Sequence, residues 1–311
     1  MENKNRIIIR EAVADSDTAA FWEQLYAYFK RDIFPEPEDP DREYFLGGEY
    51  REQIQRIHDR AENRCSWLFF SRDGQDIGLA MPVIFPAEDG KCFLMEFCVF
   101  PEFRGGTGRQ CAAALLDWAK ENGARYAELN CGNARRSRFW ESVGFRKNGA
   151  DEWGEPLMLL PPQEDAPMTV GLANGIEEFW ALELSFFAAV GETPPDSMGR
   201  SRMIGAMSAG RVAFITVKRL NRPIGLCSVS RCFSSFTCWD MGVLDDFYIE
   251  PAFRGKGAAR LLVEKAAEYC RKQGMQSLAV TCSDVDLELY RALGFTTRLG
   301  TNLTMPLPYE S

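Results

Sequence analysis

Apolar and polar residues follow one another in the same order twice along the chain. Each half opens with a short apolar stretch that predicts a strand, at residues 6–10 and 168–172. Apolar side chains at helical spacing come next and predict a helix whose stripe lies in the core. The stripe residues are Phe21, Trp22, Leu25 and Phe29 in the first half and Phe179, Trp180, Leu184 and Phe187 in the second. Prolines at 35–40 and 194–195 then end the pattern before a second predicted helix.

Period-two alternation predicts an antiparallel meander after these helices. In the first half, strands at 67–71 and 76–82 flank Asp73-Gly74, a favoured tight turn. In the second half, strands at 212–220 and 224–230 flank residues 221–223. The remaining predicted strands are 93–99, 126–131 and 156–160 in the first half and 243–249, 277–282 and 303–307 in the second. The fold class is therefore mixed α/β, with a mostly antiparallel sheet flanked by helices in each half.

The two halves also repeat short motifs at a spacing of 150 residues. Pro101-Glu102-Phe103-Arg104-Gly105 returns as Pro251-Ala252-Phe253-Arg254-Gly255, and Gly144-Phe145 returns as Gly294-Phe295. A repeat of half the chain length is too long for a solenoid and predicts two copies of one domain. Prolines and acidic residues around 161–167 mark the break. We expect one domain at 1–162, a linker at 163–167 and a second domain at 168–311.

Charge and composition narrow the classes of function. Hydrophobic residues make up 46% of the chain and charged residues 26%, which is typical of a globular protein. The net charge is −9, and the acidic excess lies in residues 1–165, since residues 166–311 hold equal numbers of acids and bases. An acidic chain is a poor default binder of nucleic acid, so we expect no nucleic-acid partner.

Histidine and cysteine usage excludes several kinds of site. The chain has one histidine, His58, so a site with several histidine ligands cannot form, and we expect no metal. The ten cysteines form no Cys-x-x-Cys pair and are expected to be free thiols in a reducing cytosol. The longest uncharged apolar run, about 78–87, is far below the roughly 18 residues that span a membrane. We expect a cytoplasmic protein without a membrane partner.

The stretch 244–262 carries the most specific chemical signal. An apolar strand ends at Pro251, and a glycine-containing loop leads into an amphipathic helix. Backbone N–H groups at the start of such a helix form an anion site. Small residues at 255 and 257–259 let a pyrophosphate approach the backbone closely.

These residues resemble the GCN5-related N-acetyltransferase (GNAT) superfamily. Residues 254–259 fit its acetyl-CoA signature, and residues 290–295 fit its Tyr-x-x-x-Gly-Phe ending. The resemblance covers nearly the whole chain as two tandem GNAT folds. It implies acetyl-CoA as acyl donor and assigns its binding to Phe247, Tyr248, Ile249, Arg254, Gly255, Lys256, Gly257, Ala258 and Ala259.

The resemblance also implies direct acetyl transfer to a primary amine in a ternary complex. The acceptor would be a small molecule or an amino-terminal group. A backbone N–H near Phe247 or Tyr248 would stabilise the oxyanion, and Tyr290 would protonate the departing thiolate. Asp245 is the preferred general base because it matches the usual glutamate of the family. For both Asp245 and Asp246, a hydrogen-bonded structural acid stays an alternative.

The first copy departs from the family pattern. Its loop at 104–109 lacks one residue, Trp140 stands in the place of Tyr290, and Met95 and Glu96 replace the two aspartates. Indole cannot replace a phenol as proton donor. We therefore expect a degenerate first domain and a catalytic second domain. A non-catalytic CoA-binding module and a two-domain aminoacyl ligase-like transferase are the alternatives. The sequence indicates neither the acceptor nor the oligomeric state.

Overall fold

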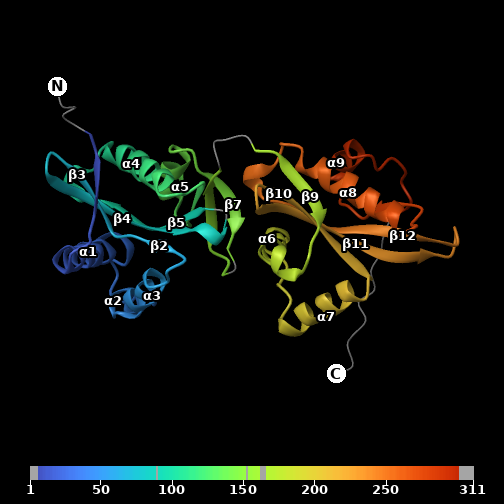
Figure 1. Ribbon diagram of the computed structural model, residues 1–311, viewed down its shortest axis with the longest axis horizontal. Helices are drawn as coiled ribbons and strands as arrows, with labels where there is room; N and C mark the ends of the chain where they lie inside the picture. The colour runs from blue at the N-terminus through green and yellow to red at the C-terminus, as the bar shows by residue number, and fades with distance from the viewer. Residues whose placement is uncertain (1–5, 89, 152, 162–165, 301–311) are drawn as a thin grey trace. The chain divides into compact units, whose positions relative to one another are not determined.

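The computed structural model describes residues 6–88, 90–151, 153–161 and 166–300 (Figure 1). The chain divides into two compact units, Met1–Asn148 with Glu155–Asp165 and Gly149–Gly154 with Ala166–Ser311. The predicted linker at 163–167 lies mostly outside the described residues, and the predicted strand at 303–307 lies wholly outside them. The mixed α/β class with mostly antiparallel sheets is confirmed in both units.

The first unit is built on an eight-stranded sheet in the order β1-β3-β4-β5-β6-β8-β7, with β2 paired to β4. Its strands are β1 Ile8–Glu11, β2 Arg64–Cys65, β3 Leu68–Arg72, β4 Gln75–Phe85, β5 Lys91–Val99, β6 Tyr126–Asn130, β7 Arg146–Ala150 and β8 Pro156–Leu160. Neighbours from β1 to β5 are antiparallel, whereas β5 and β6 run parallel. The sequence did not predict β7, because its residues are mostly polar and do not alternate.

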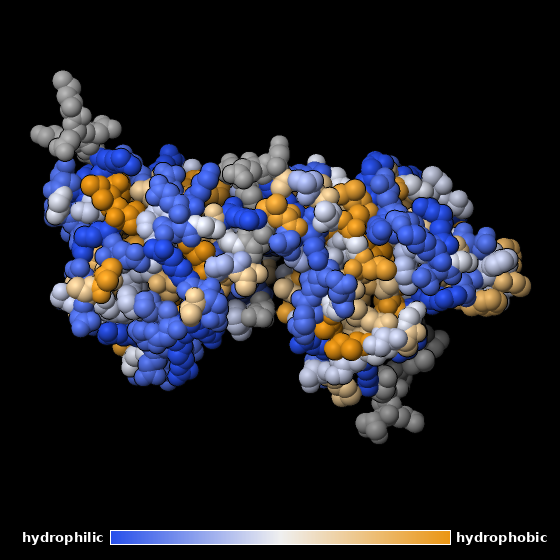
Figure 2. Space-filling view, in the orientation of Figure 1, coloured by the Kyte–Doolittle hydropathy of each residue, from blue (hydrophilic) through white to orange (hydrophobic). Residues whose placement is uncertain are grey.

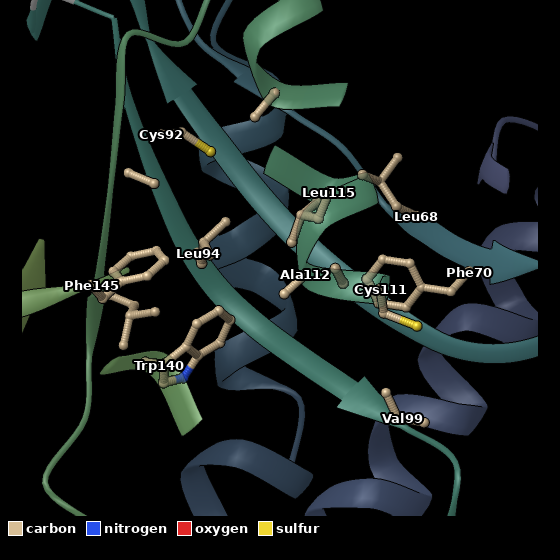
Figure 3. Packing of buried hydrophobic residues seen from close by; sticks show 14 of the residues in the cluster. Leu68, Phe70, Cys92, Leu94, Val99, Cys111, Ala112, Leu115, Trp140 and Phe145 are labelled. Carbon is tan, nitrogen blue, oxygen red and sulfur yellow. The ribbon is translucent and has the colours of Figure 1, made fainter. Parts of the chain in front are cut away.

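Helices cover both faces of this sheet (Figure 1). They are α1 Asp15–Tyr28, continued by a π-helical turn at Phe29–Ile33, then α2 Arg42–Leu46, α3 Glu49–His58, α4 Thr107–Glu121 and α5 Ala134–Glu141. The predicted stripe of α1 is buried, with Phe21 and Leu25 fully inside. On the other face, α4 packs into a second apolar cluster (Figure 3). That cluster includes Leu68, Phe70, Cys92, Leu94, Cys111, Ala112 and Leu115.

The second unit repeats the arrangement with a five-stranded sheet in the order β13-β12-β11-β10-β9. Its strands are β9 Met168–Leu172, β10 Val212–Arg219, β11 Arg222–Ser234, β12 Trp239–Ile249 and β13 Leu278–Val280. Its helices are α6 Trp180–Val190, α7 Ser197–Ser208, α8 Ala258–Lys272 and α9 Leu287–Ala292. In Figure 1, α6 and α7 lie on one side of this sheet and α8 and α9 on the other.

Several predicted strand boundaries in the second unit are wrong, and β12 begins at Trp239 instead of 243. Strand β11 begins at Arg222 instead of 224 and takes in Pro223, which is accommodated where the register shifts between Val217 and Lys218. The turn consequently narrows to Leu220 and Asn221, and Leu220 adopts a positive φ of 54°. The strand predicted at 277–282 is shorter, Leu278–Val280.

Most cysteines are interior thiols. All ten are free, and Cys65, Cys92, Cys98, Cys111, Cys227 and Cys270 are buried. Cys232 and Cys238 are exceptions, since both are exposed where the β11–β12 hairpin projects from its unit (Figure 2). Phe236 at the tip of this hairpin is 97% exposed. Among the described residues, no helix is long and apolar enough to cross a membrane.

A glycine occupies the same place in both sheets. Gly78 on β4 lies opposite Val99, and Gly225 on β11 lies opposite Ile249. A Cβ atom at Gly78 would lie 2.4 Å from the backbone oxygen of Cys98, and one at Gly225 would lie 2.9 Å from the backbone oxygen of Tyr248. Only glycine therefore lets the two central strands approach this closely.

We expect Gly78→Ala to lower the free energy of unfolding by about 1–3 kcal/mol, because the added methyl group must displace backbone. Urea denaturation measures this change. The matched control is Gly171→Ala on β9, where an added Cβ meets nothing within 4 Å. Equal midpoints for the two variants would show that β4 and β5 are not this close.

Candidate functional site

The site of the second unit begins where two parallel strands part. β12 pairs with β13 only from Gly242 to Leu244, opposite Leu278–Val280. Since β13 ends at Val280, Asp245 to Ile249 have no β13 partner for their backbone groups on that side. Backbone N–H and C=O groups need hydrogen-bonding partners, so this stretch can accept an extended ligand as a further strand. It contains the predicted contacts Phe247, Tyr248 and Ile249.

A bulge lies at the same point of β12. The register with β11 shifts between Leu226 and Ser228, and Asp246 takes a positive φ of 40°. Its carboxylate accepts a 2.6 Å hydrogen bond from the Ser228 hydroxyl. Beyond the bulge, successive side chains take opposite faces of the sheet: Tyr248 packs in the apolar cluster on the α6 face, whereas Phe247 faces α9.

Tyr290 lies on α9 within a small aromatic group. Its ring is 5.8 Å from those of both Phe247 and Phe295. Burial, with the nearby acids Asp286 and Asp245, raises the pKa of Tyr290 to about 12. Its phenol is therefore protonated at neutral pH, as a proton donor must be.

The two aspartates differ in exposure, since Asp245 is exposed and Asp246 is half-buried. Asp245 is exposed and close enough to Tyr290 for its charge to act on the phenol. Burial, followed by the charge of Asp246, raises the pKa of Asp245. Burial also raises the pKa of Asp246, although the Ser228 hydrogen bond opposes it. Asp245 lies opposite Ser228 on β11, and Ser228 lies opposite Phe214 in the apolar cluster on the α6 face, so the register places Asp245 on the same face as Asp246.

The predicted phosphate loop follows β12. After a 3₁₀ turn at Pro251–Phe253, Gly255 and Gly257 adopt φ values of 75° and 91°, and α8 begins at Ala258. A Cβ atom at either glycine would meet nothing within 4 Å, so the space over the loop is open. Lys256 is exposed, while Ala258 is buried and Ala259 half-buried in the first turn of α8. An anionic group can therefore approach the first N–H groups of the helix.

Arg254 has a structural contact that the sequence did not predict. Its Nε donates a 2.9 Å hydrogen bond to the carbonyl of Ile249, which fastens the loop to the end of β12. Arg104 makes the same 2.9 Å bond to Val99 in the first unit. We call this contact the arginine brace. Its presence in both units shows that the brace holds the loop whether the loop is long or short.

The corresponding loop of the first unit is shorter, although a Cβ atom at Gly105 or Gly106 would also meet nothing within 4 Å. α4 begins at Thr107, three residues after Arg104, whereas α8 begins four residues after Arg254. Phe139 on α5 lies against the first turn of α4, 3.1 Å from the position of a Cβ atom at Gly108. Arg109 Nε also donates a 3.1 Å hydrogen bond to the Ser142 hydroxyl, which ties α4 to α5.

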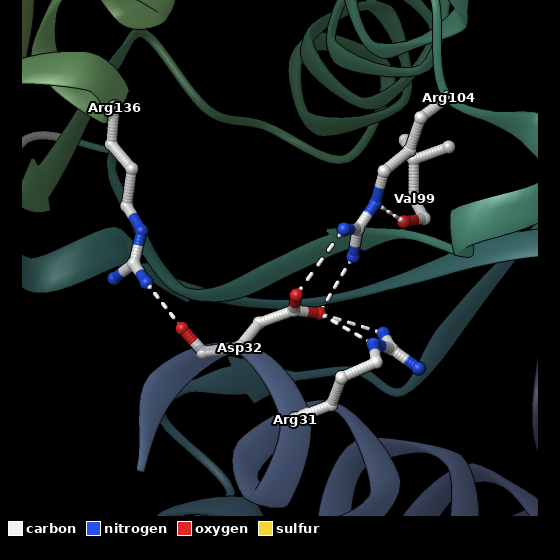
Figure 4. A network of polar contacts seen from close by, with 5 residues as sticks. All are labelled: Arg31, Asp32, Val99, Arg104 and Arg136. Atoms are coloured by element: carbon white, nitrogen blue, oxygen red, sulfur yellow. Dashed lines mark hydrogen bonds and ion pairs between the residues drawn. The ribbon is translucent and has the colours of Figure 1, made fainter. Parts of the chain in front are cut away.

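Arginines near this loop are paired within the chain (Figure 4). Arg104 donates to both carboxylate oxygens of Asp32, at 3.2 and 2.6 Å, and Arg31 donates to one of them. Arg136 on α5 donates a 2.9 Å hydrogen bond to the backbone carbonyl of Asp32. Burial opposes ionisation of Asp32, but the hydrogen bonds from Arg104 and Arg31 outweigh it and lower its pKa. All three guanidinium groups therefore already have a partner within the chain.

The first unit keeps the aromatic group but not its phenol. The Trp140 ring lies 5.1 Å from those of both Phe97 and Phe145, which repeats the arrangement around Tyr290. Glu96, in the place of Asp246, accepts a 2.9 Å hydrogen bond from the Tyr50 hydroxyl. Burial raises the pKa of Glu96 to about 8.

The sequence did not identify Glu183 of the second unit as a candidate site residue. Glu183 on α6 is 0% exposed, and neither carboxyl oxygen has a hydrogen-bond partner among the described residues. The signal was present in the repeat: Phe179-Trp180 precedes Glu183 as Phe21-Trp22 precedes Leu25. An acid therefore stands where the first copy has a core leucine. Over the described ranges, no group of His, Cys, Asp and Glu could hold a metal ion.

Comparisons with known proteins agree with the repeat. The family model of the acetyltransferase (GNAT) family matches residues 22–145 and again 176–295. A probable glucosamine 6-phosphate N-acetyltransferase of Drosophila melanogaster is 24% identical over 165 residues, which cover 50% of this chain and 69% of that protein.

Solved structures match single units of the chain. Glucosamine-6-phosphate N-acetyltransferase from Arabidopsis thaliana aligns over 46% of this chain and 99% of its own, with 14% identity and a TM-score of 0.39. A predicted acetyltransferase with acetyl-CoA from Clostridium acetobutylicum aligns over 44% of this chain and 96% of its own, with 15% identity and a TM-score of 0.38.

Proposed function

The chain belongs to the GNAT family of acetyltransferases and is an acyltransferase, and we propose that its second unit transfers acetyl groups from acetyl-CoA to a primary amine. The acceptor is a small molecule or an amino-terminal group. The observation that carries the proposal is the free backbone stretch of β12 next to the open loop before α8.

In this proposal the two ends of acetyl-CoA are held by backbone. The N–H groups at the start of α8 bind the pyrophosphate, and Gly255 and Gly257 leave room for it. The pantetheine arm pairs with the part of β12 that β13 leaves free. This binding directs the thioester towards the bulge, where the N–H of Phe247 or Tyr248 stabilises the oxyanion.

The transfer then needs one proton acceptor and one proton donor. Asp245 takes the proton of the acceptor ammonium through water, and its raised pKa makes it a stronger base than an ordinary aspartate. The amine nitrogen forms a bond to the thioester carbon, and the carbon–sulfur bond breaks. Tyr290 gives its proton to the departing thiolate. Because the cofactor loop and Tyr290 lie on the α8–α9 face, the acceptor enters from the α6 face.

The first unit does not bind acetyl-CoA in this proposal. Phe139 lies against the start of α4, the nearby guanidinium groups are paired with Asp32, and Trp140 offers no acidic proton. The relatives named above suggest an amino sugar phosphate as one acceptor to test, beside simple alkylamines and short peptides.

Calorimetric titration with acetyl-CoA is expected to give one binding site per chain. Gly257→Asp should abolish binding, because it adds bulk and a negative charge where the pyrophosphate approaches. The control is Gly106→Asp, since Gly106 is the matching N-cap of α4 with φ of 112°. Two sites, or binding retained in Gly257→Asp but lost in Gly106→Asp, would contradict the assignment.

Tyr290→Phe is expected to lower kcat at least tenfold, because proton donation contributes about 10²–10⁴-fold to such steps. Its Kd for acetyl-CoA should stay within about twofold, since the phenol oxygen donates its proton only as the carbon–sulfur bond breaks. Release of the CoA thiol in the presence of an amine panel measures the rate. Trp140→Phe in the first unit serves as control, and its rate should match that of the unmodified protein. An unchanged kcat in Tyr290→Phe would remove Tyr290 from the mechanism.

A further inference from the structure

Glu183 is a buried acid whose place in the fold does not require an acid. It lies in the first turn of α6, 0% exposed and without a hydrogen-bond partner among the described residues. Burying such a group without a partner is unfavourable. The first unit fills the matching position with Leu25, which is also 0% exposed. The fold can therefore place an apolar side chain here, and the acid needs another explanation.

Two further polar groups occupy the same face of the sheet. Asp246 at the bulge is half-buried, and Tyr248 is 3% exposed with its hydroxyl buried and unpartnered within the described part of the chain. Leu182, the neighbour of Glu183, lies in the apolar cluster that contains Tyr248 and Leu226. This face of the bulge is thus apolar, apart from a group of acids and hydroxyls that includes Ser228.

The charges around Glu183 are few. Glu183 is the only charged residue of α6. On β12 the facing acid is Asp246, and burial together with its charge raises the pKa of Glu183 to about 8. On the neighbouring turn and on β10, Glu178 and Lys218 pair with each other at 3.1 Å. At pH 7 Glu183 therefore holds its proton, so the pair carries less negative charge than two carboxylates would.

We propose that Glu183 is a positioning residue for Asp246, and that the two acids form the subsite for the ammonium group of the acceptor. Asp246 contacts the ammonium group, and Glu183 acts through Asp246. The subsite selects compact primary amines that carry their positive charge at the reacting nitrogen and no anionic group beside it. This inference rests on the proposed function, because it assigns the acceptor side of the same bulge.

The protonation of Glu183 gives the inference a distinct signature. With the subsite empty, Glu183 holds a proton until the pH approaches about 8. A bound ammonium group favours the carboxylate, so its binding at pH 7.5 releases protons to solution. The folded state binds this proton more tightly than the unfolded chain does, so Glu183 makes folding less favourable as the pH rises from about 4.5 towards 8. Glu183→Leu should therefore raise the unfolding midpoint more at pH 8 than at pH 5.

The first experiment compares acetyl transfer to n-butylamine and glucosamine between pH 6 and 9 in the unmodified protein, Glu183→Gln and Glu183→Leu. We expect both variants to raise the KM for the amine about tenfold and to lose an inflection of kcat/KM near pH 8. Their kcat and their Kd for acetyl-CoA should stay within about twofold. Glu192→Gln is the matched control, because Glu192 is an exposed acid just after α6. An unchanged amine KM and pH profile in both variants would overturn the inference.

A binding measurement separates this inference from the proposed function. n-Butylammonium is titrated into the CoA-loaded protein at pH 7.5, in two buffers with different ionisation enthalpies. Proton release in the unmodified protein that is lost in Glu183→Gln supports the subsite even if no transfer is detected, in which case the proposed function alone fails. Transfer to amines without proton release would overturn the subsite and leave the proposed function standing. Neither binding nor transfer would overturn both.

Discussion

The second unit depends on the point where β12 and β13 part. Three residue pairs hold the parallel strands together, and the next five residues of β12 have no β13 partner on that edge. The bulge at Asp246 lies at this same point and interrupts the alternation of side chains along β12, so that Asp245 and Asp246 share one face. This single interruption of the sheet therefore leaves backbone groups with which one ligand can pair. It also gives the two faces of the sheet different side chains. Phe247 and Tyr290 lie on one face, and Asp245, Asp246 and Tyr248 lie on the other.

Comparison of the two units separates what the fold needs from what the chemistry needs. Both units keep the parting strands, the close glycine on the neighbouring strand and the aromatic group around residue 140 or 290. They differ at the phenol, at the loop and at the position of Leu25 and Glu183. The shared features are apolar or backbone features. The features found only in the second unit are polar groups that are unfavourable to bury and that an inert domain can lose.

Much of this architecture was predictable because it follows from patterns of neighbouring residues. The strands at 156–160 and 168–172 have the predicted bounds, and the phosphate loop has the predicted turn into a helix. β7 was missed because Arg146 and Lys147 give it no apolar face. The start of β11 was predicted two residues too late because of Pro223. A proline can lie inside this strand only where the register with the partner strand shifts, and the sequence does not show that shift.

The site was only partly predictable for a related reason. Motif spacing identified Gly255, Gly257 and Tyr290, because these positions are close in sequence to the elements that orient them. Which of Asp245 and Asp246 face α6 depends on the bulge, and the contact of Arg254 depends on where the strand ends. Glu183 was treated as part of a helix whose stripe is apolar. Its burial is a property of tertiary packing and has no local pattern.

The arginine brace has a consequence for the history of such tandem chains. Because Arg104 and Arg254 each bond the end of their strand directly, the strand end is held independently of the residues between the arginine and the next helix. A deletion inside that loop can then abolish ligand binding without unravelling the domain. In a duplicated chain, one copy can therefore lose ligand binding by a single small step and keep its fold. Because the strand end is held independently of the loop, the length of the loop can be changed by protein engineering in either copy without loss of the fold.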